Sequence, residues 1–252
     1  MLTDISLGRY ISGTSVVHRL DPRTKMLAVL AISVGMIQGA SLAGTAWHLG
    51  LATVALALAG LPARFALRST RPFLWLAAVV FGSHLLMGGW GAWDTGLALA
   101  GRLLAMVTLA SLLSWTTQPL EIVAGLRSLG SPFARLGLPV DAGATAVGLA
   151  LRFAPIALSE ATSILQAQAA RGADFRGLRR KLALAAPMLG TLFERAFLRA
   201  DVLAEAMESR GYSPAAPRTY YRRLGFGLRD LVAACLVVGW IAGGWLIDRG
   251  GW

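Results

Sequence analysis

Two arginine–glycine pairs stand at the same place in two similar stretches of this chain. Arg171-Gly172 follows Ala167-Gln-Ala-Ala, and Arg210-Gly211 follows Ala206-Met-Glu-Ser 39 residues later. An arginine guanidinium is planar and carries five N–H donors, so it binds carboxylate or carbonyl oxygens in a fixed geometry. The small residues beside the arginines, Ala170 and Ser209, would let a partner surface come close. The repetition predicts two equivalent docking positions, each at the end of a helix.

Each pair also has a purely structural interpretation as a helix C-terminus. Glycine suits the left-handed position after the last turn, and an arginine there faces the negative end of the helix dipole. Taken singly, each pair fits this interpretation better than a binding site. Their joint occurrence on successive helices shifts the balance towards docking.

The helices that would position these arginines lie in a chain of membrane composition. Hydrophobic residues make up 56% of its 252 positions. Residues 26–63 contain no charged side chain, and long uncharged runs recur further along the chain. Because a bilayer-spanning helix needs about 20 mainly apolar residues, we expect an all-α integral membrane protein. The runs predict about five transmembrane helices near residues 26–41, 43–61, 72–88, 98–115 and 224–247.

The distribution of lysine and arginine predicts the orientation of these spans. Basic residues cluster before the first span and at residues 64–71, which we expect to be a loop, whereas residues 38–44 and 88–97 have none. The positive-inside rule then places the N-terminus and residues 64–71 in the cytoplasm, and the C-terminal residues 250–252 outside. Arg102 would fall in the outer half of the membrane, and we expect its side chain to reach the interface by snorkelling.

Residues 119–223 are predicted to be cytoplasmic. Residues 142–170 are apolar enough to suggest a further span, but a single crossing there would place eleven lysines and arginines outside. A return crossing would have to use residues 182–193, about 18 Å of helix, which is too short. We therefore expect long amphipathic helices at 141–171 and 175–210, two or three cytoplasmic coupling helices in all. The predicted divisions are residues 1–118, 119–223 and 224–252.

Several kinds of site are missing from the sequence. There is no phosphate-binding loop of the G-x-x-x-x-G-K-[ST] type, so we expect no nucleotide to bind in that manner. His18, His48 and His84 lack the spacing of metal ligands, and we predict neither a metal nor a cofactor. The net charge of +11 is attributed to topology and to anionic lipid, not to nucleic acid. No catalytic constellation is apparent.

The chain resembles a known family at three motifs. Residues 10–25, which include Asp21, Pro22, Arg23 and Lys25, resemble the N-terminal signature of the transmembrane coupling subunit of energy-coupling factor transporters, the EcfT family. Residues 170–175 and 199–212 look like its paired signature near the coupling helices. The three motifs occur in the family's order and span most of the chain.

The resemblance implies a non-enzymatic coupling subunit of an importer for vitamins or transition-metal ions, in the cytoplasmic membrane of a prokaryote. Two ABC-type ATPases and a substrate-binding membrane subunit would be its partners. By position, Arg171 and Arg210 would dock into the two ATPases, with Ala170, Gly172, Ser209 and Gly211 beside them. The alternative is a membrane enzyme or self-sufficient channel whose basic cytoplasmic helices bind lipid. Neither hypothesis identifies the substrate.

Overall fold

The computed structural model describes residues 10–11, 13–37, 41–173, 177–213 and 224–249, and the regular structure in these ranges is helical. Two compact units form, and the chain passes between them after residue 129 and before residue 223. We call them the bundle unit, described residues 10–129 and 224–249, and the two-helix unit, described residues 130–213. Residues 38–40 of the segment 38–44, residues 174–176 around the start of the helix expected at 175–210, and the C-terminal residues 250–252 lie outside the described residues.

The helices of the bundle unit follow the predicted apolar runs. They are α1 (Pro22–Ile37), α2 (Leu42–Leu58), α3 (Ala63–Gly88), the short 3₁₀ turn η1 (Gly89–Ala92), α4 (Trp93–Thr116) and α8 (Leu228–Arg249), together with the first part of α5 (Pro119–Ala134). By length and composition, residues 70–116 and α8 could cross a membrane, and α2 is a shorter apolar helix. Among the described residues, the chain is therefore an all-α membrane protein.

The expected loop at residues 64–71 is wrong, because α3 already begins at Ala63. Arg64 and Arg71 extend from its exposed surface. Arginine, alanine and leucine are good helix formers, so this polar segment continues the helix that the apolar run requires. Pro72 also stands inside α3. Charge marks where a helix can leave the apolar part of a membrane, and it does not mark where the helix ends.

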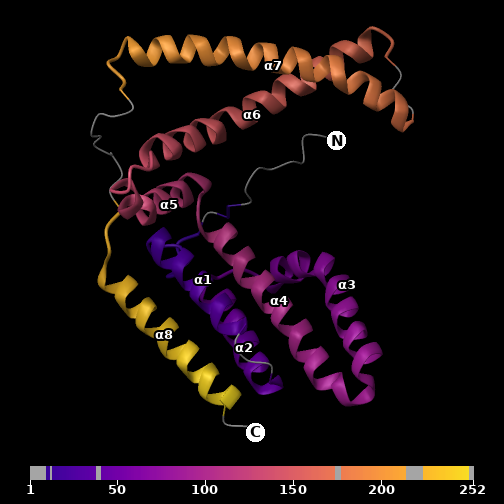
Figure 1. Ribbon diagram of the computed structural model, residues 1–252, viewed down its shortest axis with the longest axis vertical. Helices are drawn as coiled ribbons and strands as arrows, with labels where there is room; N and C mark the ends of the chain where they lie inside the picture. Colours follow the sequence, from indigo (N-terminus) through magenta and orange to yellow (C-terminus); the bar gives the residue numbers. More distant parts are fainter. Residues whose placement is uncertain (1–9, 12, 38–40, 174–176, 214–223, 250–252) are drawn as a thin grey trace. The chain divides into compact units, whose positions relative to one another are not determined.

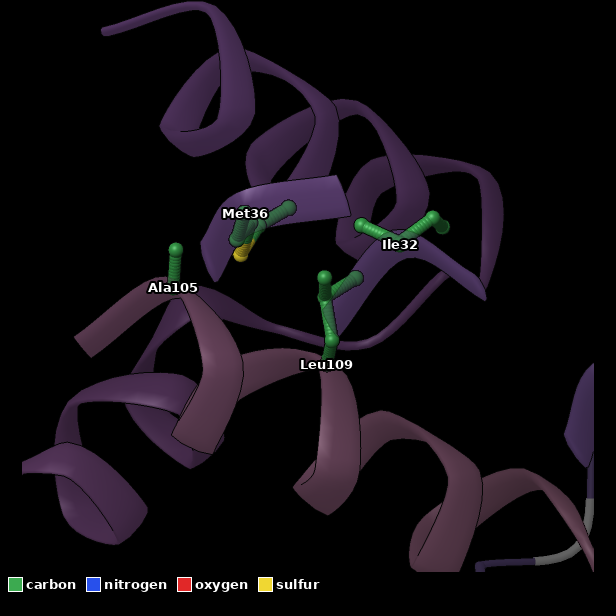
Figure 2. Close-up of a cluster of buried hydrophobic side chains, with 5 residues drawn as sticks. Ile32, Met36, Ala105 and Leu109 are labelled. Atoms are coloured by element: carbon green, nitrogen blue, oxygen red, sulfur yellow. The ribbon is translucent and has the colours of Figure 1, made fainter. Parts of the chain in front are cut away.

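The core of the bundle unit is built where α1, α2 and α4 meet. Figure 2 shows Ile32 and Met36 of α1 opposite Ala105 and Leu109 of α4, and Ala52 of α2 completes the cluster. Alanine at two of these positions lets the helix backbones approach closely, as is common in membrane helix packing. α8 comes from the far end of the chain and packs against α1 and α2. At the C-terminal end of α4, Trp115 is buried with Leu56 and Leu112.

The two-helix unit consists of the end of α5, then α6 (Val140–Ala170) and α7 (Leu178–Glu208). These helices correspond to the expected ones at 141–171 and 175–210. α5 was not predicted as a separate helix. By length and composition alone α6 is also a candidate membrane span, so its cytoplasmic location stays a prediction.

Candidate functional site

The two arginine–glycine pairs close α6 and α7 with the same backbone geometry. Gly172 has φ +79° and Gly211 has φ +74°, values that glycine adopts without a steric penalty. Gly172 N donates to Ala169 O at 3.0 Å, and Ala173 N donates to Gln168 O at 3.0 Å. At the second end, the bonds from Gly211 N to Glu208 O and from Tyr212 N to Met207 O repeat this pattern at 2.8 and 3.0 Å. Both ends are Schellman motifs.

This geometry confirms the structural part of the pattern and leaves the arginine side chains available. Arg171 and Arg210 are exposed, as are Ala170, Gly172, Ser209 and Gly211. Within the described ranges, no ion pair or hydrogen bond occupies either guanidinium. The structure does not bring the two arginines together: α6 and α7 run in opposite directions, so the two ends lie at opposite ends of the two-helix unit (Figure 1).

An ion pair joins α6 to α7. Arg199 on α7 bonds through a guanidinium nitrogen to the carboxylate of Glu160 on α6. Arg171 follows Glu160 by 11 positions, and Arg210 follows Arg199 by 11 positions. Eleven residues make about three helical turns, or roughly 16 Å. The two arginine ends are therefore equally far along their helices from the ion pair.

The ion pair borders an apolar groove between the same two helices. Its walls include Phe153 and Ala157 of α6 and Leu192, Phe193 and Ala196 of α7, and its volume is about 440 Å³. Phe193 is 61% exposed and stacks on Phe197, which is 67% exposed. Arg152 is exposed on α6. The two-helix unit thus presents apolar surface between two arginine ends.

The predicted N-terminal motif lies in the bundle unit, at the start of α1. Asp21 caps this helix, because its Oδ1 accepts a hydrogen bond from Arg23 N at 2.9 Å and Pro22 occupies the first helical position, as expected. Asp21 N donates to Asp230 Oδ1 at 2.8 Å, across 209 residues of sequence. Asp230 Oδ2 accepts from Gly227 N at 2.9 Å, which caps α8. A single buried carboxylate therefore joins the beginnings of α1 and α8.

Lys25 extends the same cluster to the end of α4. Its Nζ donates to Thr116 O at 3.0 Å, to His18 O at 3.2 Å and to Thr117 Oγ1 at 3.5 Å. Burial lowers the pKa of Lys25, which precedes the apolar run beginning at Met26, and nearby carboxylates, chiefly that of Glu121, oppose this shift. Because its three acceptors suit an ammonium group, Lys25 is an internal tie and not a binding group on the surface.

The snorkelling prediction for Arg102 is wrong. Arg102 is only 4% exposed. Its Nη1 donates to Met36 O at 2.9 Å and its Nε donates to Thr45 Oγ1 at 3.1 Å, while Nη2 lies 3.5 Å from Asp248 Oδ1. Ser41 also donates to Asp248. Burial of this arginine is possible because α1, α2 and α8 each supply an acceptor.

The histidines make separate local contacts. His18 bonds to Ser15 Oγ at 2.6 Å and to Ile11 O at 3.0 Å, and His84 bonds to Val80 O at 3.0 Å. His48 is buried in α2. In the part of the chain that the structure describes, no group of three or more histidine, cysteine or acidic residues could hold a metal ion.

Comparison with known proteins agrees with the motifs. A family model described as CbiQ, cobalt transport protein, matches residues 13–221. The energy-coupling factor transporter transmembrane protein EcfT of Bacillus subtilis is 35% identical over 247 residues, which cover 91% of this chain and 93% of the relative. The chain belongs to the EcfT/CbiQ family. The EcfT proteins of Lacticaseibacillus paracasei and Thermanaerovibrio acidaminovorans are each 37% identical, and cover 90% and 97% of the chain and 92% and 97% of their own lengths.

Membership in the EcfT/CbiQ family makes the chain a transporter membrane protein. The structure adds contacts that sequence reasoning missed: the Glu160–Arg199 ion pair, the bond from Asp21 N to Asp230, and the contacts of Asp248 with Ser41 and Arg102. Two signals in the sequence could have indicated some of them. Glu160 and Arg199 are separated by the same 39 positions as Arg171 and Arg210, and Gly227 followed by an acidic residue three positions later is a capping pattern.

Proposed function

We propose that this chain is the energy-coupling membrane subunit of an importer for vitamins or transition-metal ions in a prokaryotic cytoplasmic membrane. It transmits the conformational change of two ABC-type ATPases to a substrate-binding membrane subunit, and it performs no catalysis itself. Family membership and the transporter names of the relatives support the transporter role. The absence of a phosphate-binding loop from the sequence agrees with ATP hydrolysis on separate subunits.

The observation that carries the proposal is the equivalence of the two arginine ends. Both are exposed Schellman motifs, each 11 positions beyond the Glu160–Arg199 ion pair, and they point away from each other. A pair of similar ATPases would offer two similar acceptor sites, and each arginine would occupy one. Glycine at the left-handed position and the small side chains of Ala170 and Ser209 leave room for a partner surface at the guanidinium.

The groove between α6 and α7 supports contact with the substrate-binding subunit. Its walls are apolar, and Phe193 and Phe197 beside it are mostly exposed. When the ATPases close on ATP, the arginine ends move with them and the angle between α6 and α7 changes. Such a change would reshape the groove and so shift the substrate subunit between its states.

The test is copurification with the ATPases and ATP-driven uptake at matched expression. Charge-assisted bonds contribute about 1.5–3 kcal/mol, so losing one arginine contact should weaken ATPase binding on the order of tenfold to a hundredfold. Arg171→Lys and Arg210→Lys should each show this loss, because lysine keeps the charge but lacks the planar fork. Losing both arginines should dissolve the complex or separate hydrolysis from uptake.

Matched controls are available on the same helices. Arg152 of α6 and Arg195 of α7 are exposed, and Arg152→Lys and Arg195→Lys should behave like wild type. If Arg171→Lys and Arg210→Lys also behave like wild type, the arginines only cap their helices and the docking role is wrong.

The proposed orientation has its own test. Single cysteines at Arg64 and at Gly172, in a chain whose Cys235 is replaced by alanine, should resist membrane-impermeant thiol reagents in intact cells and react after the cells are opened. Labelling of either position from outside would overturn the cytoplasmic assignment. Labelling at Gly172 alone would show that α6 crosses the membrane.

A further inference from the structure

The N-terminal motif contacts every segment by which the bundle unit continues into the two-helix unit. The chain leaves the bundle unit through the α4–α5 junction and α5, and it returns just before α8. The points at which these segments contact the motif are more than 100 positions apart in the sequence, so nothing local holds them together. The residues of the motif divide these contacts among themselves: Pro22 and Lys25 meet the outgoing segment, and Asp21 and Arg23 meet the returning one.

The outgoing segment is held at two places: Lys25 bonds to the α4–α5 junction, and the first turn of α1 packs against α5. The Lys25 ammonium group bonds to Thr116 O and Thr117 Oγ1, where α4 gives way to α5. α5 then lies against α1 at the buried Gly125, where an added Cβ would stand 3.1 Å from Met26 Sδ and 3.6 Å from Pro22 Cβ. A Cβ at that point would require Met26 Sδ to move by a few tenths of an ångström.

On the returning segment, Asp21 and Arg23 make the contacts. Asp21 N bonds to Asp230 Oδ1, and the same carboxylate caps α8 at Gly227 N. The Arg23 guanidinium lies 5.2 Å from the centre of the Phe226 ring, a cation–π arrangement. Asp21, Lys25 and Asp230 are each no more than 7% exposed, so these bonds are shielded from water.

We propose that the Asp21–Lys25 segment is a mechanical anchor that fixes the outgoing and returning segments at a constant separation. The inference rests on the proposed function, because an anchor matters only if force passes through the two-helix unit. When nucleotide moves α6 and α7, the anchored ends stay in place and the displacement reaches the groove. Without the anchor, the outgoing and returning segments separate, and the displacement of α6 and α7 is taken up by that separation and does not reach the groove.

The experiment measures the separation of the two segments by pulsed electron paramagnetic resonance. Spin labels replace Leu126 of α5 and Leu231 of α8, which are 55% and 62% exposed, in a chain with Cys235→Ala that is purified with its ATPases. Distances are recorded without nucleotide and with ATP plus vanadate. The anchored chain should give one narrow distribution that nucleotide leaves unchanged. Lys25→Met and Asp230→Asn should broaden it and make it nucleotide-dependent.

The matched control is Asp248→Asn, which disturbs the opposite end of α8 by weakening its contacts with Ser41 and Arg102. This variant should lose thermal stability like the anchor variants but keep the narrow distance. If Lys25→Met and Asp230→Asn also keep it, the anchor is wrong. Another outcome is failure of the anchor variants to assemble with the ATPases. In that case, assembly of an equally destabilised Asp248→Asn variant supports the anchor. Failure of all three variants to assemble overturns it.

Failure of the proposed function would look different. If wild-type chain recovers no ATPase, the coupling proposal fails whatever the label distances show. The anchor is then tested in the isolated chain, where Lys25→Met must still broaden the distribution relative to Asp248→Asn. An intact wild-type complex with unaltered distances in the anchor variants refutes the anchor alone.

Discussion

The bundle unit and the two-helix unit differ in how far they bury their charged side chains. In the bundle unit, Arg102 and Lys25 are buried, and each is bonded to acceptors from other elements. In the two-helix unit, α6 buries only Ala161 and Ile164, and residues 185–208 of α7 include no buried one. The comparison teaches that the bundle unit surrounds Arg102 and Lys25 with its own acceptors, whereas the two-helix unit leaves Arg171 and Arg210 exposed.

Exposed apolar surface does not by itself separate the two units. Leu30, Val34 and Leu236 of the bundle unit are exposed to much the same degree as Leu189, Phe193 and Val202 of the two-helix unit. Lipid can cover the former, since hydrocarbon tails are as apolar as leucine. The two units differ in the burial of their charged side chains. Substitutions of charged residues should therefore affect the stability of the two units most differently.

The largest expected effect is at Arg102. Arg102→Met should destabilise the bundle unit by about 3–5 kcal/mol, because it leaves Asp248 and the Met36 carbonyl without their buried partner. Thermal unfolding of the purified chain in detergent measures this. Arg152→Met on exposed α6 should change the unfolding midpoint little. Similar shifts for the two variants would mean that the bundle unit does not depend on its buried charges.

The next effect is at the two helix ends. Gly172→Ala and Gly211→Ala should each cost about 1–2 kcal/mol, since both glycines are left-handed. Amide hydrogen exchange in the last turns of α6 and α7 would show the fraying. Gly190, inside α7 with open space around it, is the matched control, and Gly190→Ala should stabilise the helix by about 0.5–1 kcal/mol. Destabilisation at all three sites would contradict the assigned end geometry.

A smaller effect is expected at the Glu160–Arg199 pair. The Arg199 side chain is 37% exposed and that of Glu160 is 19% exposed, so water screens the interaction. A double-mutant cycle with Glu160→Gln and Arg199→Met should give a coupling energy of about 0.2–1 kcal/mol in the isolated chain. A coupling of several kcal/mol would show that the two-helix unit is held together by its charges, like the bundle unit.

The smallest effect on stability should be that of Arg171→Lys and Arg210→Lys. Lysine keeps the charge at the helix end, so the isolated chain should lose less than about 1 kcal/mol. The same variants should still impair ATPase copurification. Stability and ATPase copurification should be measured on one preparation. Substitution of a docking residue lowers copurification but not stability, whereas substitution of a structural residue lowers both. A large loss of stability would assign these arginines to the fold.

Much of the helical framework follows from local sequence. Long apolar runs locate α1, α2, α4 and α8, because a helix is the local way to satisfy backbone polar groups in a membrane. Asp21-Pro22 marks the start of α1, and Gly172 and Gly211 mark helix ends through their conformational freedom. The start of α3 was misplaced because charge was read as a loop, although helix propensity continues through it.

The sequence by itself determined the membrane class, the start of α1, the ends of α6 and α7, and the family, since composition, capping residues and motifs are local properties. Only the tertiary structure decided that Arg102 is buried, that Asp230 and Asp248 tie the two ends of α8, and that Glu160 meets Arg199. Whether a charge lies in water or inside a protein depends on acceptors supplied by distant helices. Arg102 and Arg171 are the same amino acid, and their different roles follow from what the fold places around each guanidinium.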